Sequence, residues 1–366
     1  MEYRAIGIMS GSSLDGLDIA FVVFNETGRK WGFAIEAAEC FAYPAEWVEK
    51  LKNSVNLHAK DYLLLHAEYG HYIGRQVNAF IEKYGLQHRV QIIASHGHTV
   101  FHFPPSGMTG QLGNGAAIAA ETGINTVSDL RDMDVALGGQ GAPIVPMGEK
   151  LLFEEYPLLL NLGGIANISA ALPNGYIAYD ICPANRVLNM LASEIGLDYD
   201  KGGKIAKNGM VRDEALSALN QLPYFAEPFP KSLDNGFGIE VVYPLLKRFN
   251  LGTHDAMRTM VEHICIQLMR NAGRLAAQMT PGFTKKMLVT GGGAFNSFLV
   301  EKLRNSLLPL GIEPIIPDEN TVNYKEALVM ALLGVLRWRE ENTVIHTVTG
   351  ANRSSIGGAV WMGQEA

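Results

Sequence analysis

Apolar residues along the chain alternate between short runs of strand length and longer segments with helical spacing. Two apolar runs, at residues 3–9 and 17–24, flank a turn rich in Gly and Ser, which predicts a β-hairpin. Over residues 59–84 the apolar positions recur every three or four residues, and the same spacing predicts helices over 257–278 and 325–340. Strands that alternate with such helices predict an α/β fold.

Glycine-rich turns follow three of the predicted strands. They lie at residues 11–16, 163–164 and 291–293, and the third leads into a helix predicted over 296–307. Backbone N–H groups of successive turn residues form a concavity that binds anions, and glycine allows a ligand to approach the backbone closely. A single glycine turn is most often only a turn. Three of them in one chain predict a nucleotide that is held from two sides.

Asp180 is a lone carboxylate directly after a strand predicted over 175–179. Residues 182–185 then turn the chain into a helix predicted over 186–195, with Asn185 as its N-cap. A carboxylate at a strand end that faces a crevice is a frequent position for the general base of an α/β enzyme. The alternative interpretation is a turn Asp that hydrogen-bonds to its own backbone.

Three histidines, His96, His98 and His102, are the best candidate for a metal site, and a three-His site would predict a zinc hydrolase. No carboxylate stands at ligand spacing among them, which favours hydrogen-bonding loop residues instead. Arg131 lies in a mixed-charge loop after a strand and has the fork geometry that clamps a substrate carboxylate. Glu326 opens an apolar helix, and the simplest interpretation is that it favours the helix dipole.

The chain has 366 residues, 48% of them hydrophobic, which is enough for about two domains with a sizeable core. Its formal charge of −7 and the lack of a Lys/Arg cluster argue against a nucleic-acid partner. Three widely separated cysteines without CxxC spacing argue against disulfides and predict a reduced, cytoplasmic setting. The N-terminus lacks the apolar stretch of a signal peptide, and the most apolar run, residues 327–336, is too short to span a membrane, so no membrane partner is expected.

Five stretches, in this order and spread over nearly the whole chain, carry more specific patterns. They are Gly-Ile-Met-Ser-Gly-Ser-Ser-Leu-Asp-Gly-Leu-Asp at 7–18, Ser-His-Gly-His-Thr at 95–99, Ser-Asp-Leu-Arg at 128–131 with the glycine-rich 138–143, Asn-Leu-Gly-Gly-Ile-Ala-Asn-Ile at 161–168, and Val-Thr-Gly-Gly-Gly-Ala-Phe-Asn at 289–296. With these stretches the chain resembles the anhydro-N-acetylmuramic acid kinases, members of the actin, sugar kinase and Hsp70 superfamily. The first and the fourth stretch are the most specific.

The resemblance implies a fold of two actin-like, ribonuclease H-like domains around a cleft that opens and closes about a hinge. Residues 1–130 with about 341–366 would form the first domain and 131–340 the second, and the glycine-rich 138–143 would lie at their junction. The resemblance further implies a kinase that uses ATP and Mg²⁺ to phosphorylate the 6-oxygen of 1,6-anhydro-N-acetylmuramic acid while water opens the anhydro bridge. The product would be N-acetylmuramic acid 6-phosphate, formed in peptidoglycan recycling, and the enzyme would be a homodimer.

Asp180 would then be the base that activates this water. The residues expected to hold the sugar are Thr99, Arg131, Asn185 and Glu326. The residues expected to hold magnesium through water are Asp15 or Asp18. The residues expected to bind the nucleotide are Gly11, Ser12, Ser13, Leu14, Asp15, Gly16, Leu17, Asp18, Gly163, Gly164, Gly291, Gly292, Gly293 and Asn296.

The chain departs from the usual family pattern on the side expected to bind the sugar. Ile181, Cys182 and Ala184 stand where the family commonly has Thr, Gly and Gly. His98 replaces a usual Gln, Asn114 replaces a usual Asp, and the stretch after Ser232 is also altered. The preferred sugar is therefore open, and the alternative function is a catalytically weakened paralogue that binds nucleotide or muropeptide sugar as a regulator.

Overall fold

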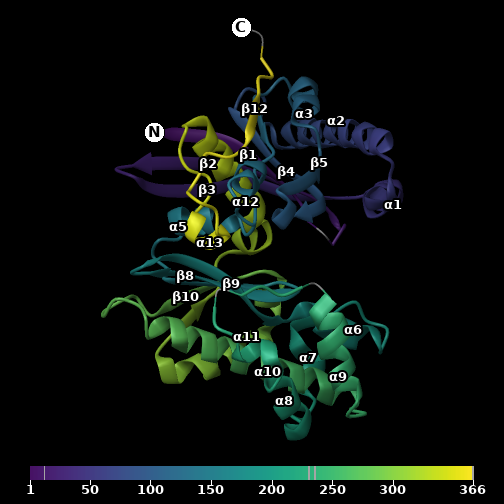
Figure 1. Cartoon of the computed structure of the whole chain (residues 1–366), viewed down its shortest axis with the longest axis vertical. Coiled ribbons are helices and arrows are strands. Elements are labelled where there is room, and N and C mark those ends of the chain that lie inside the picture. Colours follow the sequence, from purple (N-terminus) through teal and green to yellow (C-terminus); the bar gives the residue numbers. More distant parts are fainter. Residues whose placement is uncertain (12, 230, 235, 365–366) are drawn as a thin grey trace. The chain divides into compact units, whose positions relative to one another are not determined.

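The computed structural model describes the whole chain except residues 12, 230, 235 and 365–366 (Figure 1). The chain divides into two compact units, Met1–Phe153 with Tyr324–Ala366 and Glu154–Asn323. It therefore passes between the units after Phe153 and before Tyr324. The glycine-rich 138–143 lies within the first unit, and the domain ranges suggested by the sequence remain a prediction.

The first unit is built on a seven-stranded sheet in the order β12-β6-β4-β1-β2-β3, with β5 paired to β4. β1 pairs antiparallel with β2 and parallel with β4, and β4 pairs parallel with β6. The predicted hairpin is confirmed, since β1 and β2 form it. The strands are β1 Glu2–Ser10, β2 Gly16–Thr27, β3 Lys30–Ala42, β4 Ile92–Phe103, β5 Met108–Leu112, β6 Thr126–Ser128 and β12 Ala359–Trp361.

Helices cover both faces of this sheet. Ile6 and Ile8 of β1 share a core cluster with Tyr69 and Ile73 of α2, which extends over the residues predicted to be helical. Gly7 points to the opposite face, where an added Cβ would collide with the main chain of α12 at Ala327. The helices are α1 Ala45–Asn53, α2 Ala59–Tyr84, α3 Gly115–Thr122, α4 Asp132–Ala136, α5 Val145–Leu152, α12 Glu319–Trp338 and α13 His346–Thr349.

The helix α12 belongs to both units, because the unit boundary falls inside it. Its backbone leaves helical geometry at the boundary residue Tyr324, where φ is −115° and ψ is 17°. Directly after this residue, Lys325 forms an ion pair with Glu149 of α5 at 2.7 Å, and the two side chains are only 6% and 4% exposed. A buried ion pair therefore joins α5, after which the chain leaves the first unit, to the part of α12 in which the chain returns to it.

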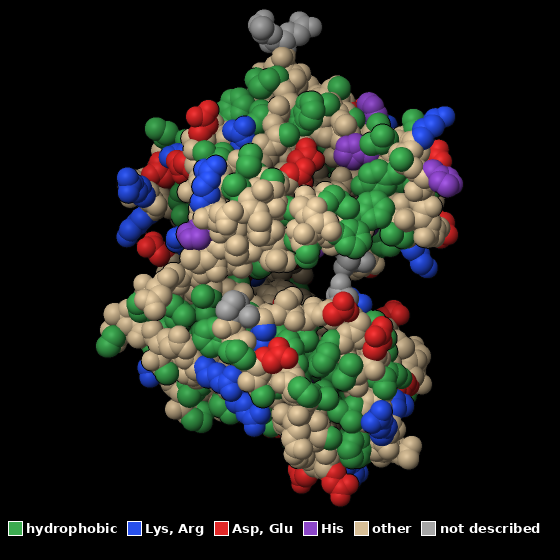
Figure 2. All heavy atoms as spheres, viewed as in Figure 1, with side chains coloured by type: hydrophobic (Ala, Val, Ile, Leu, Met, Phe, Trp, Pro, Cys, Tyr) green, Lys and Arg blue, Asp and Glu red, His purple; other side chains and the backbone are tan. Residues whose placement is uncertain are grey.

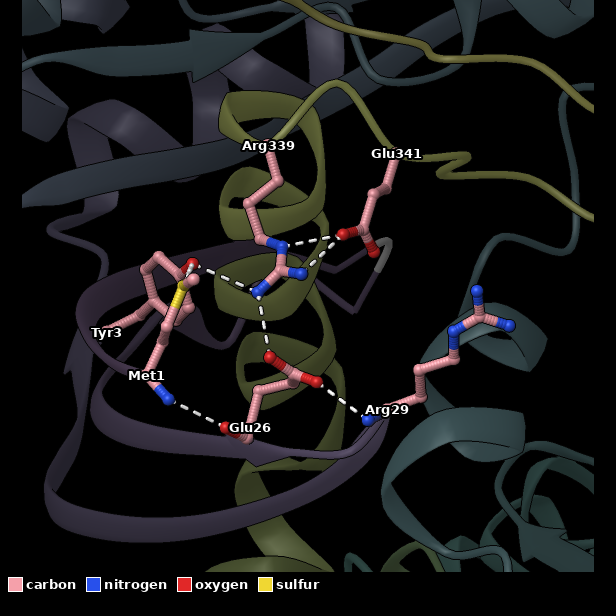
Figure 3. A network of polar contacts seen from close by, with 6 residues as sticks. All are labelled: Met1, Tyr3, Glu26, Arg29, Arg339 and Glu341. Carbon is pink, nitrogen blue, oxygen red and sulfur yellow. Dashed lines mark hydrogen bonds and ion pairs between the residues drawn. The ribbon is translucent and has the colours of Figure 1, made fainter.

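The other end of α12 is fastened to the N-terminal hairpin by a polar network (Figure 3). Arg339 donates from Nη1 to the Tyr3 hydroxyl at 2.9 Å and from Nε to Glu341 at 2.6 Å. Glu26 of β2 lies 3.4 Å from the same guanidinium and also accepts a hydrogen bond from the backbone of Arg29 at 2.7 Å. The network links the first and last segments of the first unit.

The second unit is built on a five-stranded sheet in the order β11-β10-β7-β8-β9. Met257, Met260 and Ile264 of the helix α10 belong to one core cluster with Leu158 and Leu160 of β7. The strands are β7 Leu158–Leu162, β8 Ile165–Leu172, β9 Gly175–Pro183, β10 Lys286–Thr290 and β11 Glu313–Ile315. The helices are α6 Asn185–Ser193, α7 Lys204–Lys207, α8 Asp213–Asn220, α9 Tyr243–Lys247, α10 Thr253–Ala276 and α11 Ser297–Leu307.

The two sheets share one topology. In each unit three successive strands form antiparallel neighbours, β1-β2-β3 and β7-β8-β9. A later strand then adds parallel to the first of the three, and a further strand adds parallel to that one, as β4 and β6 do in the first unit and β10 and β11 in the second. This repetition confirms the predicted α/β class of two similar actin-like domains.

Acidic and basic side chains are interspersed on the face of each unit that Figure 2 shows, so neither sign of charge dominates it. No helix in the described part of the chain combines the length and the apolar composition that crossing a membrane requires.

Candidate active site

Asp180 lies at an irregularity in the pairing of β9 with β8. Ala166 of β8 faces Cys182, while the next residue, Asn167, faces Asp180, so Ile181 is an extra residue on β9. The prediction that the strand ends at residue 179 is wrong, because β9 continues to Pro183. The bulge buries the side chain of Ile181 completely and leaves that of Asp180 half-buried.

The Asp180 carboxylate is held by a segment more than 50 residues further along the chain. Its Oδ2 accepts hydrogen bonds from the backbone N–H of Leu233 at 2.9 Å and from the Ser232 hydroxyl at 3.3 Å. Its main chain donates to the carbonyl of Lys231 at 3.1 Å and accepts from the Tyr224 hydroxyl at 2.7 Å. Burial raises the pKa of Asp180, and the two hydrogen bonds to its carboxylate act in the opposite direction. These contacts are not those of a turn Asp that bonds to its own backbone.

The turn at Gly163 and Gly164 is attached to the start of α6. The backbone N–H groups of Ala184 and Asn185 donate to the carbonyls of Gly164 and Gly163 at 2.8 and 3.1 Å. The prediction of Asn185 as the N-cap is wrong, because Ala184 occupies that position. The Asn185 amide instead donates to the carbonyl of Leu162 at 2.8 Å, so it fixes the turn to the helix.

The turn at 291–293 packs against the end of β7 and against Asn185. Gly291 has φ 81° and ψ 163°, a conformation that favours glycine, and a Cβ on it would lie 2.6 Å from the Asn161 side chain. A Cβ on Gly293 would lie 2.6 Å from the Leu162 side chain and 3.2 Å from Asn185 Oδ1. The structure therefore brings two of the three glycine turns together around Asn185, within the second unit.

The side chain of Asn296 has a structural role within the second unit. It is the N-cap of α11, and its Oδ1 accepts from the backbone N–H of Leu299 at 3.0 Å. A fourth glycine turn, Gly202 and Gly203, packs directly against it, since a Cβ on Gly203 would collide with the Asn296 side chain. Sequence reasoning missed this turn, although two adjacent glycines before the short helix α7 were a usable signal.

The first hairpin turn joins β1 to β2, and the predicted Ser12 lies outside the described residues. The Ser13 hydroxyl lies 3.6 Å from the position of an added Cβ on Gly11, so it is close to the backbone of that glycine. Leu14 has a positive φ of 60°, and Gly16 packs against Cys40. The side chain of Leu17 is fully buried in the core, so only its backbone could meet a ligand.

Asp15 and Asp18 form a pair of neighbouring carboxylates. Burial raises the pKa of Asp18, a hydrogen bond from the Cys40 thiol lowers it, and the charge of Asp15 raises it again. Two carboxylates that repel each other in this way are stabilised by a cation between or beside them, and Mg²⁺ prefers oxygen ligands. The residues present at this turn therefore fit a magnesium ion.

Arg131 interacts with His96 and Glu326 in the first unit. Arg131 Nε donates to Nε2 of His96 at 2.9 Å, so Nδ1 of His96 carries the proton that binds the Gly97 carbonyl at 2.8 Å. Burial and the nearby Arg131 lower the pKa of His96 to about 3, which keeps it neutral. Burial lowers the pKa of Arg131 to about 10, and Glu326 opposes this shift.

Glu326 keeps access to solvent, yet the surrounding protein changes its ionisation. Desolvation raises its pKa, Lys325 and Arg131 lower it, and Asp18 raises it. Thr99 lies on β4, three residues after His96, and its buried hydroxyl has no hydrogen-bond partner among the described residues. An unsatisfied buried hydroxyl is available to a ligand.

His98 takes part in a buried chain of hydroxyl groups at the end of β1. Its Nδ1 lies 3.2 Å from the Ser10 hydroxyl, which accepts from Tyr43 at 2.8 Å, and Tyr43 in turn contacts the Tyr69 hydroxyl at 2.5 Å. Burial lowers the pKa of His98. His98, which stands where the family usually has Gln, therefore contacts Ser10, the residue directly before the first glycine turn.

The three histidines considered as zinc ligands each contact another group. His96 contacts Arg131 and Gly97, His98 contacts Ser10, and His102 Nδ1 lies 3.1 Å from the Thr109 hydroxyl. Within the described part of the chain, no group of three His, Cys, Asp or Glu residues is arranged to hold a metal ion by itself.

The model of one protein family, described as anhydro-N-acetylmuramic acid kinase, matches residues 3–363. The anhydro-N-acetylmuramic acid kinase of Vibrio cholerae serotype O1 is 34% identical over 369 residues, which cover 97% of this chain and 97% of the relative. The protein of the same name from Sulfurovum sp. (strain NBC37-1) is 33% identical, with 98% and 99% covered. One similar solved structure is the activator of the 2-hydroxyisocaproyl-CoA dehydratase from Clostridium difficile with bound ADPNP. Its TM-score is 0.45 at 14% sequence identity, and the match covers 92% of this chain and 96% of that chain. A likeness this distant carries no argument. The chain belongs to the anhydro-N-acetylmuramic acid kinase family.

Proposed function

We propose that this chain is an ATP-dependent kinase that hydrolytically converts 1,6-anhydro-N-acetylmuramic acid to N-acetylmuramic acid 6-phosphate in peptidoglycan recycling. The observation that carries this proposal is the family match over residues 3–363. The position of Asp180 supports it, because a half-buried carboxylate held by two hydrogen bonds suits a general base.

In this mechanism Asp180 takes a proton from the water that attacks the anomeric carbon. The bond from that carbon to the bridging oxygen breaks, and the freed 6-oxygen attacks the γ-phosphoryl group of ATP, whose bond to the β–γ bridging oxygen breaks so that ADP leaves. Both hydrogen bonds to the carboxylate go to Oδ2, so we assign the proton to Oδ1. A general base of this kind contributes about 10²–10⁴-fold to the rate.

The glycine turns would supply backbone N–H groups to the phosphates of ATP. Gly11 and Ser13 would act in the first unit, and Gly163, Gly164 and the 291–293 turn in the second. Asp15 and Asp18 would hold Mg²⁺, and the ion neutralises phosphate charge when it is bound. Carboxylate oxygens are the ligand type that Mg²⁺ prefers, which supports the assignment.

The sugar would be held by Arg131, Thr99, Glu326 and Asn185. The Arg131 guanidinium, fixed through Nε by His96, would present its other edge to the carboxylate of the muramic acid. The Thr99 hydroxyl would satisfy its hydrogen bond with a sugar oxygen or the amide. Asn185 uses one amide N–H within the fold, which leaves its second N–H and its Oδ1 for the ligand.

We also propose a homodimer in the cytoplasm. The homodimer follows from the family resemblance. The cytoplasmic setting is supported by three cysteines that are all free thiols, Cys40, Cys182 and Cys265.

The test is ADP release by the purified protein with 1,6-anhydro-N-acetylmuramic acid and a panel of related anhydro and free sugars. In oxygen-18 water, the label is expected at the anomeric carbon of the product and not in its phosphate. Binding of nucleotide and sugar without turnover would instead indicate the weakened paralogue. Label in the phosphate would contradict the mechanism.

A further inference from the structure

Arg186 lies in the first turn of α6 and against the Gly163–Gly164 turn. Its backbone N–H donates to the carbonyl of Gly164 at 3.3 Å. Its guanidinium lies over the same glycine, since an added Cβ on Gly164 would be 3.6 Å from Nε and 3.9 Å from Nη2. Both the main chain and the side chain of Arg186 are therefore placed by this turn.

The charge and the Nε–H of Arg186 both lack a protein partner among the described residues. Among the described residues it forms no ion pair with an acidic side chain, and its buried Nε–H has no hydrogen-bond partner. A buried donor on a cation is costly without an acceptor. Such a donor is expected where an anionic ligand supplies the missing oxygen.

A second unsatisfied donor lies at the same edge of the sheet. Thr290 is the last residue of β10, is 1% exposed, and its hydroxyl has no partner among the described residues. Because β10 and β7 are parallel and Thr290 pairs with Asn161, both strands end at the edge from which the turns at 163–164 and 291–293 emerge. The N-terminus of α6 at this edge adds a partial positive charge.

We propose that Arg186 binds a phosphate group of the nucleotide at the Gly163–Gly164 turn. This inference rests on the proposed kinase function and adds a residue that the motifs did not indicate. Gly164 carries no side chain beside the guanidinium, and Nε and Nη2 form the edge that arginine offers to a phosphate in bidentate geometry. Arg186 would then supply a fixed positive charge from the protein in addition to the metal ion.

The experiment compares the binding of ATP, ADP and adenosine to the wild type, Arg186→Gln and Arg186→Lys by calorimetry. Arg186→Gln is expected to weaken ATP binding about 10–100-fold, the equivalent of one charged hydrogen-bond pair, and to leave adenosine binding within about twofold. Arg186→Lys keeps a point charge and is therefore expected to lose less ATP affinity than Arg186→Gln. Arg304→Gln, on the exposed side of α11 in the same unit, is the matched control. It is expected to change neither ATP binding nor adenosine binding.

Thermal unfolding without ligand separates binding from a structural role. Because its Nε–H is buried without a partner among the described residues, Arg186→Gln is expected to keep or raise the Tm. Equal losses of ATP and adenosine binding, or unchanged ATP binding in both variants, would overturn the inference and leave the kinase function intact. A wild type that neither binds ATP nor releases ADP would overturn the proposed function itself.

Discussion

Replacing Asp180 with Asn removes the charge of the proposed base and keeps the shape of its side chain. The Asn oxygen can still accept the hydrogen bonds that Leu233 and Ser232 now donate to Oδ2 at 2.9 and 3.3 Å. The segment 231–233 is therefore expected to keep its position. Turnover is expected to fall about 10²–10⁴-fold, the usual contribution of a general base, while the Kd values for ATP and sugar stay within about twofold.

The same substitution is expected to stabilise the protein at neutral pH. Burial raises the folded-state pKa of Asp180 above its ordinary value of 3.8, so the folded chain binds this proton more tightly than the unfolded chain. The wild type therefore loses stability as the pH rises through the folded pKa, whereas Asn does not titrate. The Tm of the variant is expected to exceed that of the wild type at about pH 7, and the difference is expected to shrink toward about pH 3.

ADP release and thermal unfolding, measured on the same preparations, check both expectations. Asp213→Asn is the control, because Asp213 is an exposed carboxylate in the first turn of α8 in the same unit. Wild-type turnover in Asp180→Asn would refute the assignment of the base. A variant that loses turnover together with stability at neutral pH would show that Asp180 acts through the fold and not on water.

Three further substitutions test other parts of the structure. Lys325→Met removes the cation 2.7 Å from Glu149 at a buried position and is expected to cost about 3–5 kcal/mol in denaturant unfolding. Lys50→Met, which loses two surface ion pairs and a cation–π contact with Trp47, is expected to cost only about 1–2 kcal/mol, and equal losses would contradict this contrast. Thr99→Val removes a hydroxyl without a partner among the described residues, so it is expected to raise the KM for the sugar about tenfold while the free energy of unfolding changes by less than about 1 kcal/mol. An unchanged KM would remove Thr99 from the sugar site. Gly11→Val is expected to fold, because beyond its two chain neighbours the nearest described atom to an added Cβ is 3.6 Å away, and to weaken ATP binding at least about tenfold. Gly16→Val is the contrasting variant: its Cβ would lie 2.6 Å from Cys40 Sγ, so it is expected to lower the Tm. Undiminished ATP affinity in Gly11→Val would count against the assignment of the first hairpin turn to the phosphates of ATP.

The elements that sequence reasoning located correctly are those with local signals. The helix α2 matches its predicted range because its apolar residues keep one spacing and Gly85 ends it in a left-handed conformation. The strand β3 was missed, since it lies at the edge of the sheet and its residues are mostly exposed or half-buried. An edge strand of this kind has no apolar run to find.

The candidate site was only partly predictable, because its geometry depends on contacts between distant segments. Asp180 was identified, but its bulge and its bond to Leu233 depend on pairing with β8 and on a loop 53 positions away. Asn185 was given the N-cap position by residue type, whereas its side chain reaches Leu162, 23 positions earlier. Nothing in the local sequence distinguishes Arg186 from any other arginine at a helix start; only its proximity to Gly164 does.

The insertion of the second unit between Phe153 and Tyr324 has a consequence for synthesis on the ribosome. Residues 154–323 emerge as one continuous segment and can fold as soon as they leave the exit tunnel. The first unit starts earlier but finishes later, because the face of β1 at Gly7 is covered only when α12 has been made. The nascent first unit therefore carries an uncovered sheet face throughout the synthesis of the second, and that interval is when a chaperone is most needed.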